Sequence, residues 1–481
     1  MGRADFLYKS FLDAFGWEPT TCQENFFRDT ASFVTSPDHD IMVLAGYAGT
    51  GKTTAVSAVV KALGGLGTKC VLLAPTGRSA KVLSSYAGRE AYTIHKHIYR
   101  QKSVGADGFG QFSLSPNKAV NTLFVVDEVS LIGMDSEASR GQSSGLFGSG
   151  NLLEDLVNFV RSGADCRLLM IGDRAQLPPV GLDESPALSE EYMRSAFSGV
   201  LFSTMTTVVR QARESGILHN ATIIRNVISS MAEGDPQSSL KLELDGFDDI
   251  SMVEGGELIE TISDAYGRYG DDQTIVLCRS NKRAIRYNAG IRSTVQFKED
   301  QLVKGERLMV VKNCYQFLEN VKNMSYIANG DIARLDRIGD FEERYGLNFA
   351  TARLSFPDYD DVQIRAKVIL DTLASESPSL TWEQSNMLYQ GVDADYSYIT
   401  TKKKRYEAVR EDPYFNALQL KYSNAITCHK SQGGQWECVF VDNAFWQDTL
   451  TLDDLKWLYT AFTRATKRLY LVNYKKLEWK I

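Results

Sequence analysis

The sequence contains no long hydrophobic run, and no stretch reaches the roughly 18 to 20 apolar residues that a membrane-spanning helix needs. The start of the chain, MGRADFLYKSFLDAFGW, carries acidic side chains and no continuous apolar segment, so we expect no secretory signal peptide. Phe6 occupies the position where a myristoylation signal starting at Gly2 requires Ser or Thr. These absences predict a cytoplasmic protein without a membrane attachment.

The chain also lacks the cysteine and histidine patterns of disulfide scaffolds and zinc sites. Its seven cysteines are an odd number, include no CxxC pair and mostly lie in apolar runs. Buried, reduced thiols are therefore expected. The five histidines show no spacing such as HExxH, so we predict no structural zinc site.

The chain does not carry the strong positive charge of proteins that coat nucleic acid, because its formal net charge is −7. A whole-chain charge averages over all surfaces, so a local basic groove remains compatible with this value. Of the 481 residues, 43% are hydrophobic and 23% are charged, which is typical of an ordinary globular protein. This length corresponds to about two to four folding units.

Apolar runs of strand length alternate with segments of helical period, which is typical of parallel-sheet α/β units. A first set of runs lies at 41–47, 69–75, 122–128 and 166–173. A later set, separated widely along the chain, lies at 274–280, 437–443 and 468–474. We therefore predict an α/β fold with two such units, covering 1–98 with 122–205 and 206–300 with 422–481.

Two segments do not fit this alternation and are predicted to be insertions. Residues 99–121 carry glycine-rich turn chemistry and predict a β-hairpin in the first unit. Residues 301–421 contain short alternating or β-branched runs followed by a polar stretch, and predict a mostly β insertion in the second unit. The KKKR run at 402–405 is interpreted as a solvated charged face.

The clearest motif is GYAGTGKT at 46–53, which fits GxxxxGK[ST] and follows a predicted strand. Glycines let backbone N–H groups close around phosphates, and the dipole of the following helix favours an anion. Lys52 can reach the β- and γ-phosphates, and Thr53 can hold Mg²⁺. We therefore predict ATP and Mg²⁺ as cofactors, with nucleotide contacts at Gly46, Ala48, Gly49, Thr50, Gly51, Lys52, Thr53 and Thr54.

Polar side chains follow two further strands at the edge where parallel strands present ligands. In VVDEVS, Asp127 is the candidate Mg²⁺ ligand and Glu128 the candidate base for a water, although a solvated acidic turn is the alternative. In MIGDRAQLPPVG, Gln176 is expected to sense the γ-phosphate or the attacking water, the alternative being a proline-rich turn. A water-activating glutamate indicates hydrolysis.

Upstream, Gln23 is a candidate for an adenine contact, and the sequence leaves open an ordinary surface glutamine. Arg464 falls opposite the apolar stripe of a predicted helix over 451–466, among small residues. The second unit has no phosphate loop of its own, so Arg464 and Arg210 are candidate fingers for a nucleotide bound by the first unit. A solvated surface arginine is the alternative for each.

Three further segments, PTGRSA, YTIHKHIY and AITCHKSQGGQWE, carry hydroxyl, amide and cationic groups suited to backbone phosphates of nucleic acid. The alternatives are helix capping for Thr76 and a half-buried, satisfied imidazole for His429. Gly433 is expected in a turn beside the nucleotide. The nucleic-acid candidates are Pro75, Thr76, Arg78, Thr93, His95, Thr427, His429, Lys430 and Ser431.

In this order, the segments from residue 23 to 474 resemble the superfamily 1 helicases of the 5′→3′ RecD/Dda-like branch. The matching stretches are Gln23, GYAGTGKTT, LLAPTGRSA, YTIH, VVDEVS, IGDRAQLPPVG, VVRQA, HKSQGGQ and YTAFTRATKRLYLV. The resemblance implies two RecA-like domains with ATP between them. It also implies that 99–121 is a strand-separating pin, tipped by Phe109 or Phe112, and that 301–421 is an SH3-like domain.

The resemblance further implies an ATP-dependent 5′→3′ DNA helicase that moves on single-stranded DNA and opens forked or tailed duplexes. It suggests a monomer from a phage or bacterium, with single-strand-binding or replication proteins as partners. Gln435 departs from the pattern, because many relatives have a glutamate there that contacts the nucleotide sugar. Two alternatives stay open: a translocase that displaces proteins without efficient unwinding, and a P-loop switch or kinase.

Overall fold

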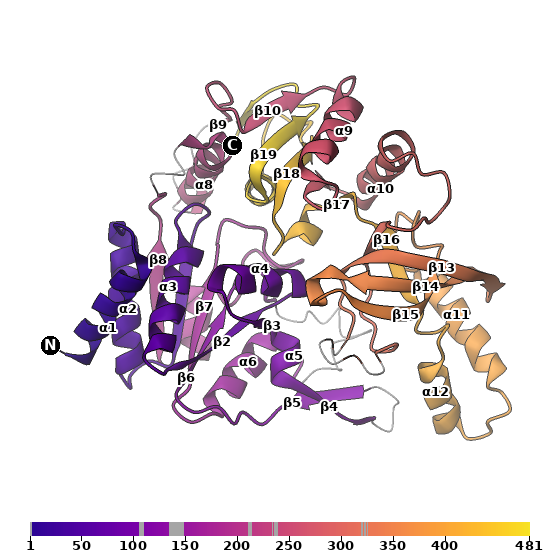
Figure 1. Ribbon diagram of the computed structural model, residues 1–481, viewed down its shortest axis with the longest axis horizontal. Helices are drawn as coiled ribbons and strands as arrows, with labels where there is room; N and C mark the ends of the chain where they lie inside the picture. The colour runs from indigo at the N-terminus through magenta and orange to yellow at the C-terminus, as the bar shows by residue number, and fades with distance from the viewer. Residues whose placement is uncertain are drawn as a thin grey trace.

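The computed structural model describes residues 2–104, 110–133, 149–209, 214–232, 234, 239–318, 321, 324 and 326–481. Two α/β units lie one above the other, and a β-rich insertion lies to one side of them (Figure 1). Within the described part of the chain, no helix is long and apolar enough to cross a membrane.

The first unit is built on a fully parallel six-stranded sheet. Its strands, in spatial order, are β3 (Ala91–Thr93), β2 (Lys69–Ala74), β6 (Thr122–Val126), β7 (Arg167–Gly172), β1 (Ile41–Gly46) and β8 (Val200–Met205). One core packs against α1 (Arg3–Phe15), α2 (Thr21–Thr35), α3 (Lys52–Gly65) and α4 (Gly77–Ala87). A second core packs against α5 (Ile94–Ile98), α6 (Leu152–Arg161) and α7 (Glu190–Ala196). Burial from both sides explains the continuous apolar runs of the central strands.

The second unit has a parallel five-stranded sheet whose strands come from distant segments, as the sequence predicts. In spatial order they are β10 (Ile250–Val253), β19 (Ala465–Val472), β18 (Trp436–Asp442), β11 (Thr274–Cys278) and β17 (Ala425–Thr427). Its two cores include α8 (Gly216–Ala232) with α13 (Leu452–Phe462), and α9 (Leu258–Tyr269) with α10 (Asn281–Gly290). A small ribbon pairs β9 (Ser239–Lys241) with β20 (Glu478–Lys480).

Both insertions are present, and the predicted fold class is confirmed. A hairpin extends from the first unit, and a closed barrel is inserted in the second. The hairpin pairs β4 (Tyr99–Val104) with β5 (Gly110–Leu114). The barrel contains β12 (Arg307–Val310), β13 (Ile332–Arg344), β14 (Leu347–Phe356), β15 (Val362–Ile369) and β16 (Leu418–Tyr422).

The polar stretch of the barrel insertion also forms helices that the strand pattern does not predict. They are α11 (Trp382–Asp395) and α12 (Lys402–Glu411). Thr381 starts α11 with a capping box, since its hydroxyl accepts the Gln384 N–H and the Gln384 side chain accepts the Thr381 N–H. The run 402–405 forms the first turn of α12, and its three lysines are exposed, as expected for a solvated face.

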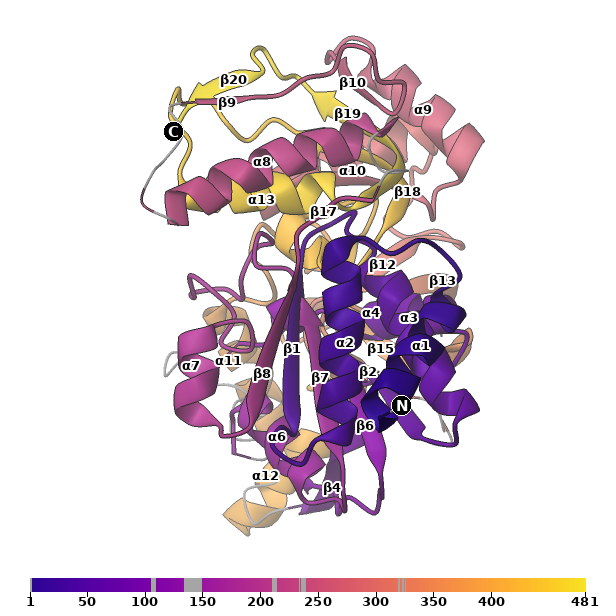
Figure 2. The ribbon, with the colours of Figure 1, turned by 90° about the vertical axis from the view of Figure 1, so that its left-hand side faces the viewer.

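The predicted helix over 451–466 is wrong at its C-terminal end. α13 stops at Phe462, and the chain turns before β19 begins at Ala465. Trp457 of this helix is buried. The reason is that α13 lies between the second sheet and the first unit, beside α8 (Figure 2), so all of its residues from Asp454 onward are buried. Arg464 therefore lies in a turn between two buried elements.

Candidate nucleotide and nucleic-acid site

The loop between β1 and α3 is shaped to bind an anion. Gly49 and Gly51 both have φ of +74°, a backbone conformation that favours glycine. Gly51 caps α3 without any side-chain acceptor, so the N–H groups of the first helical turn stay available for a ligand. Free N–H groups together with the helix dipole fit the phosphates of a nucleotide.

Lys52 points into the mouth of this loop. Its Nζ donates a hydrogen bond to the Tyr47 carbonyl at 2.8 Å and lies 3.9 Å from the Asp173 carboxylate. Asp173 comes from the loop after β7 and is buried. A phosphate that engages Lys52 must therefore replace contacts with two loops of the first unit.

Asp127 and Glu128 stand at the end of β6 in the same cleft. Asp127 accepts the Glu128 N–H at 2.8 Å. Burial, with the neighbouring Glu128 charge, raises the pKa of Asp127 to about 7. Glu128 adopts a φ of +56°, a strained conformation for a residue other than glycine. Adjacent carboxylates near Thr53 supply the oxygen ligands that Mg²⁺ prefers, so these residues fit the metal.

Gln176 lies in the loop after β7 and is only 8% exposed. Its side-chain carbonyl oxygen is buried and has no hydrogen-bond partner among the residues that the structure describes. Leaving such an acceptor unpaired costs about 1–3 kcal/mol. Gln176 also lines the cleft, so this acceptor is compatible with a water or another donor there, and its role toward the γ-phosphate stays a prediction.

Arg464 lines this same cleft from the second unit, although it is only 2% exposed. Its Nε and Nη1 donate to the carbonyls of Thr460 and Gly434, both at 3.1 Å, and its Nη2 donates to the Thr463 hydroxyl at 3.2 Å. These neutral acceptors orient the guanidinium without cancelling its charge. The cleft has a volume of about 480 Å³ and is lined from both units, by Lys52, Thr53, Asp127, Glu128, Gln176 and Arg464 among others.

The other predicted finger, Arg210, lies outside the described residues, although Val209 and Ser215 line the cleft. Gln435 also lines it and accepts a hydrogen bond from the Tyr86 hydroxyl at 3.5 Å. Gly433 has a φ of +73° and lies against Thr76 at the contact between the units.

Gln23 is 1% exposed, so its interpretation as a surface residue is wrong. Its Nε2 donates to the Thr50 carbonyl at 2.9 Å, and its Oε1 accepts the Thr20 N–H at 2.9 Å. Gln23 thus supports the phosphate loop from α2. Its contact with adenine stays a prediction.

The sequence did not identify Tyr459 and Thr460 as site residues, yet both join α13 to loops of the first unit. The Tyr459 hydroxyl donates to Asp173 at 2.7 Å and accepts the Ala48 N–H at 2.8 Å. The Thr460 hydroxyl accepts the Leu177 N–H at 2.8 Å. The one sequence signal was that Tyr459 belongs to an apolar stripe. A tyrosine in such a stripe is expected to be buried, and a buried hydroxyl needs a hydrogen-bond partner.

Several nucleic-acid candidates of the first unit have structural roles. Thr76 caps α4, accepting the Ser79 N–H at 3.1 Å, and Thr93 caps α5, accepting the Lys96 N–H at 3.3 Å. Pro75 and Thr76 form a half-buried bend before α4. Arg78 lies with its guanidinium carbon 4.1 Å from the centre of the Trp436 ring and donates a hydrogen bond to the Gln435 carbonyl. Burial lowers the pKa of His95 to about 4, so it is neutral near pH 7.

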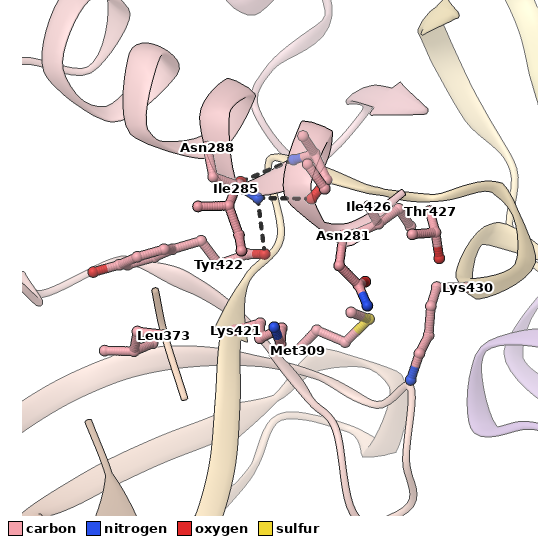
Figure 3. A pocket seen from close by; sticks show the side chains of 12 residues that line it. Asn281, Ile285, Asn288, Met309, Leu373, Lys421, Tyr422, Ile426, Thr427 and Lys430 are labelled. Atoms are coloured by element: carbon pink, nitrogen blue, oxygen red, sulfur yellow. Dashed lines mark hydrogen bonds between the residues drawn. The ribbon is translucent and has the colours of Figure 1, made fainter. Parts of the chain in front are cut away.

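Of the nucleic-acid candidates in the second unit, two line a pocket, one is exposed beside it and one is buried in the interior. Thr427 and Lys430 line a small pocket of about 20 Å³ between α10, β17 and the barrel strands β12 and β16, together with Asn281 and Lys421 (Figure 3). His429 is exposed nearby. The buried Ser431 turns inward, its hydroxyl donating to the Cys428 carbonyl at 2.7 Å.

The pocket's two lysines approach it from different parts of the second unit. The Lys421 Nζ donates to the Ser375 carbonyl at 2.5 Å, and Lys430 donates to the Asn329 side chain. Burial lowers the pKa of each lysine to about 8. Across the described residues, neither forms an ion pair with a carboxylate, so no carboxylate there neutralises the charge of either lysine. Phe109 and the side chain of Phe112, the predicted pin tips, lie outside the described residues.

The chain is similar to several known proteins and family models. Residues 28–139 match the family model described as an AAA domain, and residues 422–472 match the UvrD-like helicase C-terminal domain. The ATP-dependent RecD2 DNA helicase of Deinococcus radiodurans is 37% identical over 142 residues, which are 30% of this chain but only 16% of that protein.

A longer match is to the ATP-dependent DNA helicase Dda of Enterobacteria phage T4. It is 24% identical and covers 89% of this chain and 91% of that one. A solved structure of Pif1 helicase from Bacteroides, in complex with ADP-AlF3 and single-stranded DNA, shares 15% identity. It covers 95% of this chain and 93% of that chain, with a TM-score of 0.42.

Proposed function

We propose that this chain, which belongs to the superfamily 1 helicases of the RecD and Dda type, is an ATP-driven motor that moves 5′→3′ along single-stranded DNA and opens duplex ahead of it. One observation carries the proposal: Lys52 of the first α/β unit and Arg464 of the second line a single cleft. A nucleotide bound there is in contact with both units, so its hydrolysis can change how they are arranged.

The chemistry is assigned to the residues of the cleft. Lys52 and the first-turn N–H groups of α3 orient the phosphates, while Thr53 and Asp127 hold Mg²⁺. Glu128 accepts the proton of a water that Gln176 orients, and Arg464 compensates charge as the γ-phosphate leaves. Bound Mg-ATP supplies the phosphoanhydride bond whose hydrolysis drives the cycle.

Movement follows from the position of the cleft. Because its binding groups come from two units, a triphosphate favours their closed arrangement, and hydrolysis releases it. If each unit grips the single strand in turn, this cycle moves the protein along DNA. In this proposal, hairpin 99–121 acts as the pin that parts the duplex, with the barrel insertion beside it.

The directional claim is tested with duplexes that carry a single-stranded tail on one end. With ATP, we expect the chain to separate a 5′-tailed duplex and to leave a 3′-tailed duplex intact, measured by release of a labelled strand. Separation of the 3′-tailed duplex alone would contradict the direction. Stimulation of ATP hydrolysis by single-stranded DNA without separation of either duplex would favour the translocase that displaces proteins.

The lysine pocket gives a pH-dependent prediction. The pKa of both Lys421 and Lys430 is lowered to about 8, and a DNA phosphate favours the charged form of each lysine. Affinity for single-stranded DNA should therefore be at its full value below pH 8 and fall as the pH rises from 8 to 9. Fluorescence anisotropy of a labelled oligonucleotide measures this change.

The matched variants separate the pocket from general charge effects. Replacing Lys421 and Lys430 together by methionine should flatten the pH dependence between 7 and 9. It should also reduce the salt dependence of binding, by about 0.7 in the log–log slope for each DNA phosphate that the variant no longer neutralises. Lys403→Met, at an exposed position of α12, should leave both unchanged. An unaltered pH profile in the double variant would show that no phosphate binds in this pocket.

A further inference from the structure

We propose that Tyr459 is a positioning residue for ATP hydrolysis, whose hydroxyl couples the phosphate loop of the first unit to the turn that carries Arg464 in the second. This inference rests on the proposed function of the cleft. It assigns Tyr459 no contact with the nucleotide, because its effect passes through Ala48, Asp173 and Arg464.

The hydroxyl of Tyr459 occupies a junction between distant parts of the chain. Tyr459 is 1% exposed and belongs to α13 of the second unit. Its hydroxyl accepts the N–H of Ala48, inside the phosphate loop, and donates to Asp173 at the end of the loop's neighbouring strand. Both partners belong to the first unit, so one oxygen atom links α13 to two of its loops.

The partners of this hydroxyl are themselves tied to groups of the cleft. Asp173 lies 3.9 Å from Lys52 Nζ, and its other oxygen accepts the Ala175 N–H at 3.0 Å, next to Gln176. Any ligand that draws Lys52 away from Asp173 changes the balance of charge around the carboxylate. The Tyr459 hydroxyl is hydrogen-bonded to that same carboxylate and therefore responds to the same event.

The far end of the link is the turn of Arg464. The Tyr459 carbonyl accepts the Thr463 N–H at 3.1 Å, and the Thr460 carbonyl accepts Arg464 Nε. Tyr459 and Arg464 are thus separated by a single turn of backbone with defined hydrogen bonds. A shift of the hydroxyl toward or away from the phosphate loop changes the placement of the guanidinium in the cleft.

The state of the phenol supports a fixed donor role. Burial and the neighbouring Asp173 carboxylate raise the pKa of Tyr459 well above its ordinary value. The hydroxyl therefore stays protonated across the working pH range and keeps donating to Asp173. A phenylalanine retains the packing of the ring but leaves the Ala48 N–H and the Asp173 oxygen without this partner.

The test compares two tyrosine-to-phenylalanine changes in the second unit. Tyr459→Phe removes the junction hydroxyl, whereas Tyr474→Phe removes a hydroxyl that is also buried but has no hydrogen-bond partner in the described part of the chain. We expect Tyr459→Phe to lower kcat for ATP hydrolysis roughly 10- to 100-fold, as for misplaced catalytic groups, while KM for ATP changes less than about threefold. Tyr474→Phe should keep the wild-type kcat and KM.

The measurement is made with and without single-stranded DNA, and thermal unfolding confirms that both variants are folded. A loss of kcat that occurs in Tyr459→Phe but not in Tyr474→Phe supports the inference, whether it is seen with or without single-stranded DNA. Equal kcat values for the two variants, or a loss that appears only as a raised KM, would overturn it. If DNA fails to stimulate the wild type, the motor proposal fails, and the kcat comparison without DNA still decides the role of Tyr459.

Discussion

Arg464→Ala is expected to lower ATP hydrolysis in the presence of single-stranded DNA by about 10³-fold or more, which is the usual range for arginine fingers. The guanidinium lines the cleft beside Lys52, and its hydrogen bonds go to two carbonyls and one hydroxyl, so its positive charge is available to the leaving phosphate. Nucleotide affinity should change far less than turnover, because the first unit keeps its phosphate loop. Steady-state hydrolysis and equilibrium binding of ATP measure the two effects separately.

Two matched changes define the specificity of this effect. Arg464→Lys keeps the charge but cannot make the three hydrogen bonds that orient the guanidinium, so most of the loss should persist. Arg468→Ala, in β19, removes a half-buried arginine whose partners are Asp248 and Ser251, and turnover should stay near wild type. Near-normal hydrolysis by Arg464→Ala would mean that Arg464 is no finger, and Arg210 would become the leading candidate.

Glu128→Gln is expected to lower turnover about 10²- to 10⁴-fold, the usual contribution of a general base. The substitution preserves the shape of the side chain and its strained backbone position, but it removes the group that accepts the proton of water. Because Lys52, Thr53 and Asp127 are unchanged, ATP should still bind. Single-turnover hydrolysis of pre-bound ATP isolates the chemical step.

The control for this variant is Glu154→Gln, which neutralises an exposed glutamate in the first turn of α6. It should hydrolyse ATP at the wild-type rate. If Glu128→Gln retained more than about a tenth of the wild-type single-turnover rate, a different group would have to accept the proton. The assignment of Glu128 would then be wrong, whatever the fate of Arg464.

Much of the fold was accessible from the sequence because its signals are local. Buried parallel strands are continuous apolar runs, and the phosphate loop needs glycine at positions with positive φ, such as Gly49 and Gly51. The polar ends of β6 and β7 were identified by the same reasoning, since strand ends at one edge of a sheet meet. The sequence therefore predicted residues that the structure brings into one cleft.

The remaining features depend on contacts between distant segments, which periodicity does not report. α13 ends at Phe462, where the chain turns between the two units. The apolar stripe was assigned on a helix that continued to 466, so the position of Arg464 was predicted wrongly. Thr76 offers the same hydroxyl to a helix cap or to a phosphate, and the sequence left both open. Tyr459 resembled a core residue because its partners lie 286 and 411 positions away. Lys421 of the barrel and Lys430 line one pocket because the folded chain brings β16 next to the segment after β17, which the sequence pattern does not indicate.

The most direct test of the motor is the rate of ATP hydrolysis by the unmodified chain with and without single-stranded DNA. The cleft joins two units, and both are proposed to grip the strand, so DNA should favour the closed arrangement in which Arg464 meets the nucleotide. We expect a large increase in turnover that grows with DNA concentration and saturates. An equal rate with and without DNA would contradict it and return the chain to the class of P-loop switches or kinases.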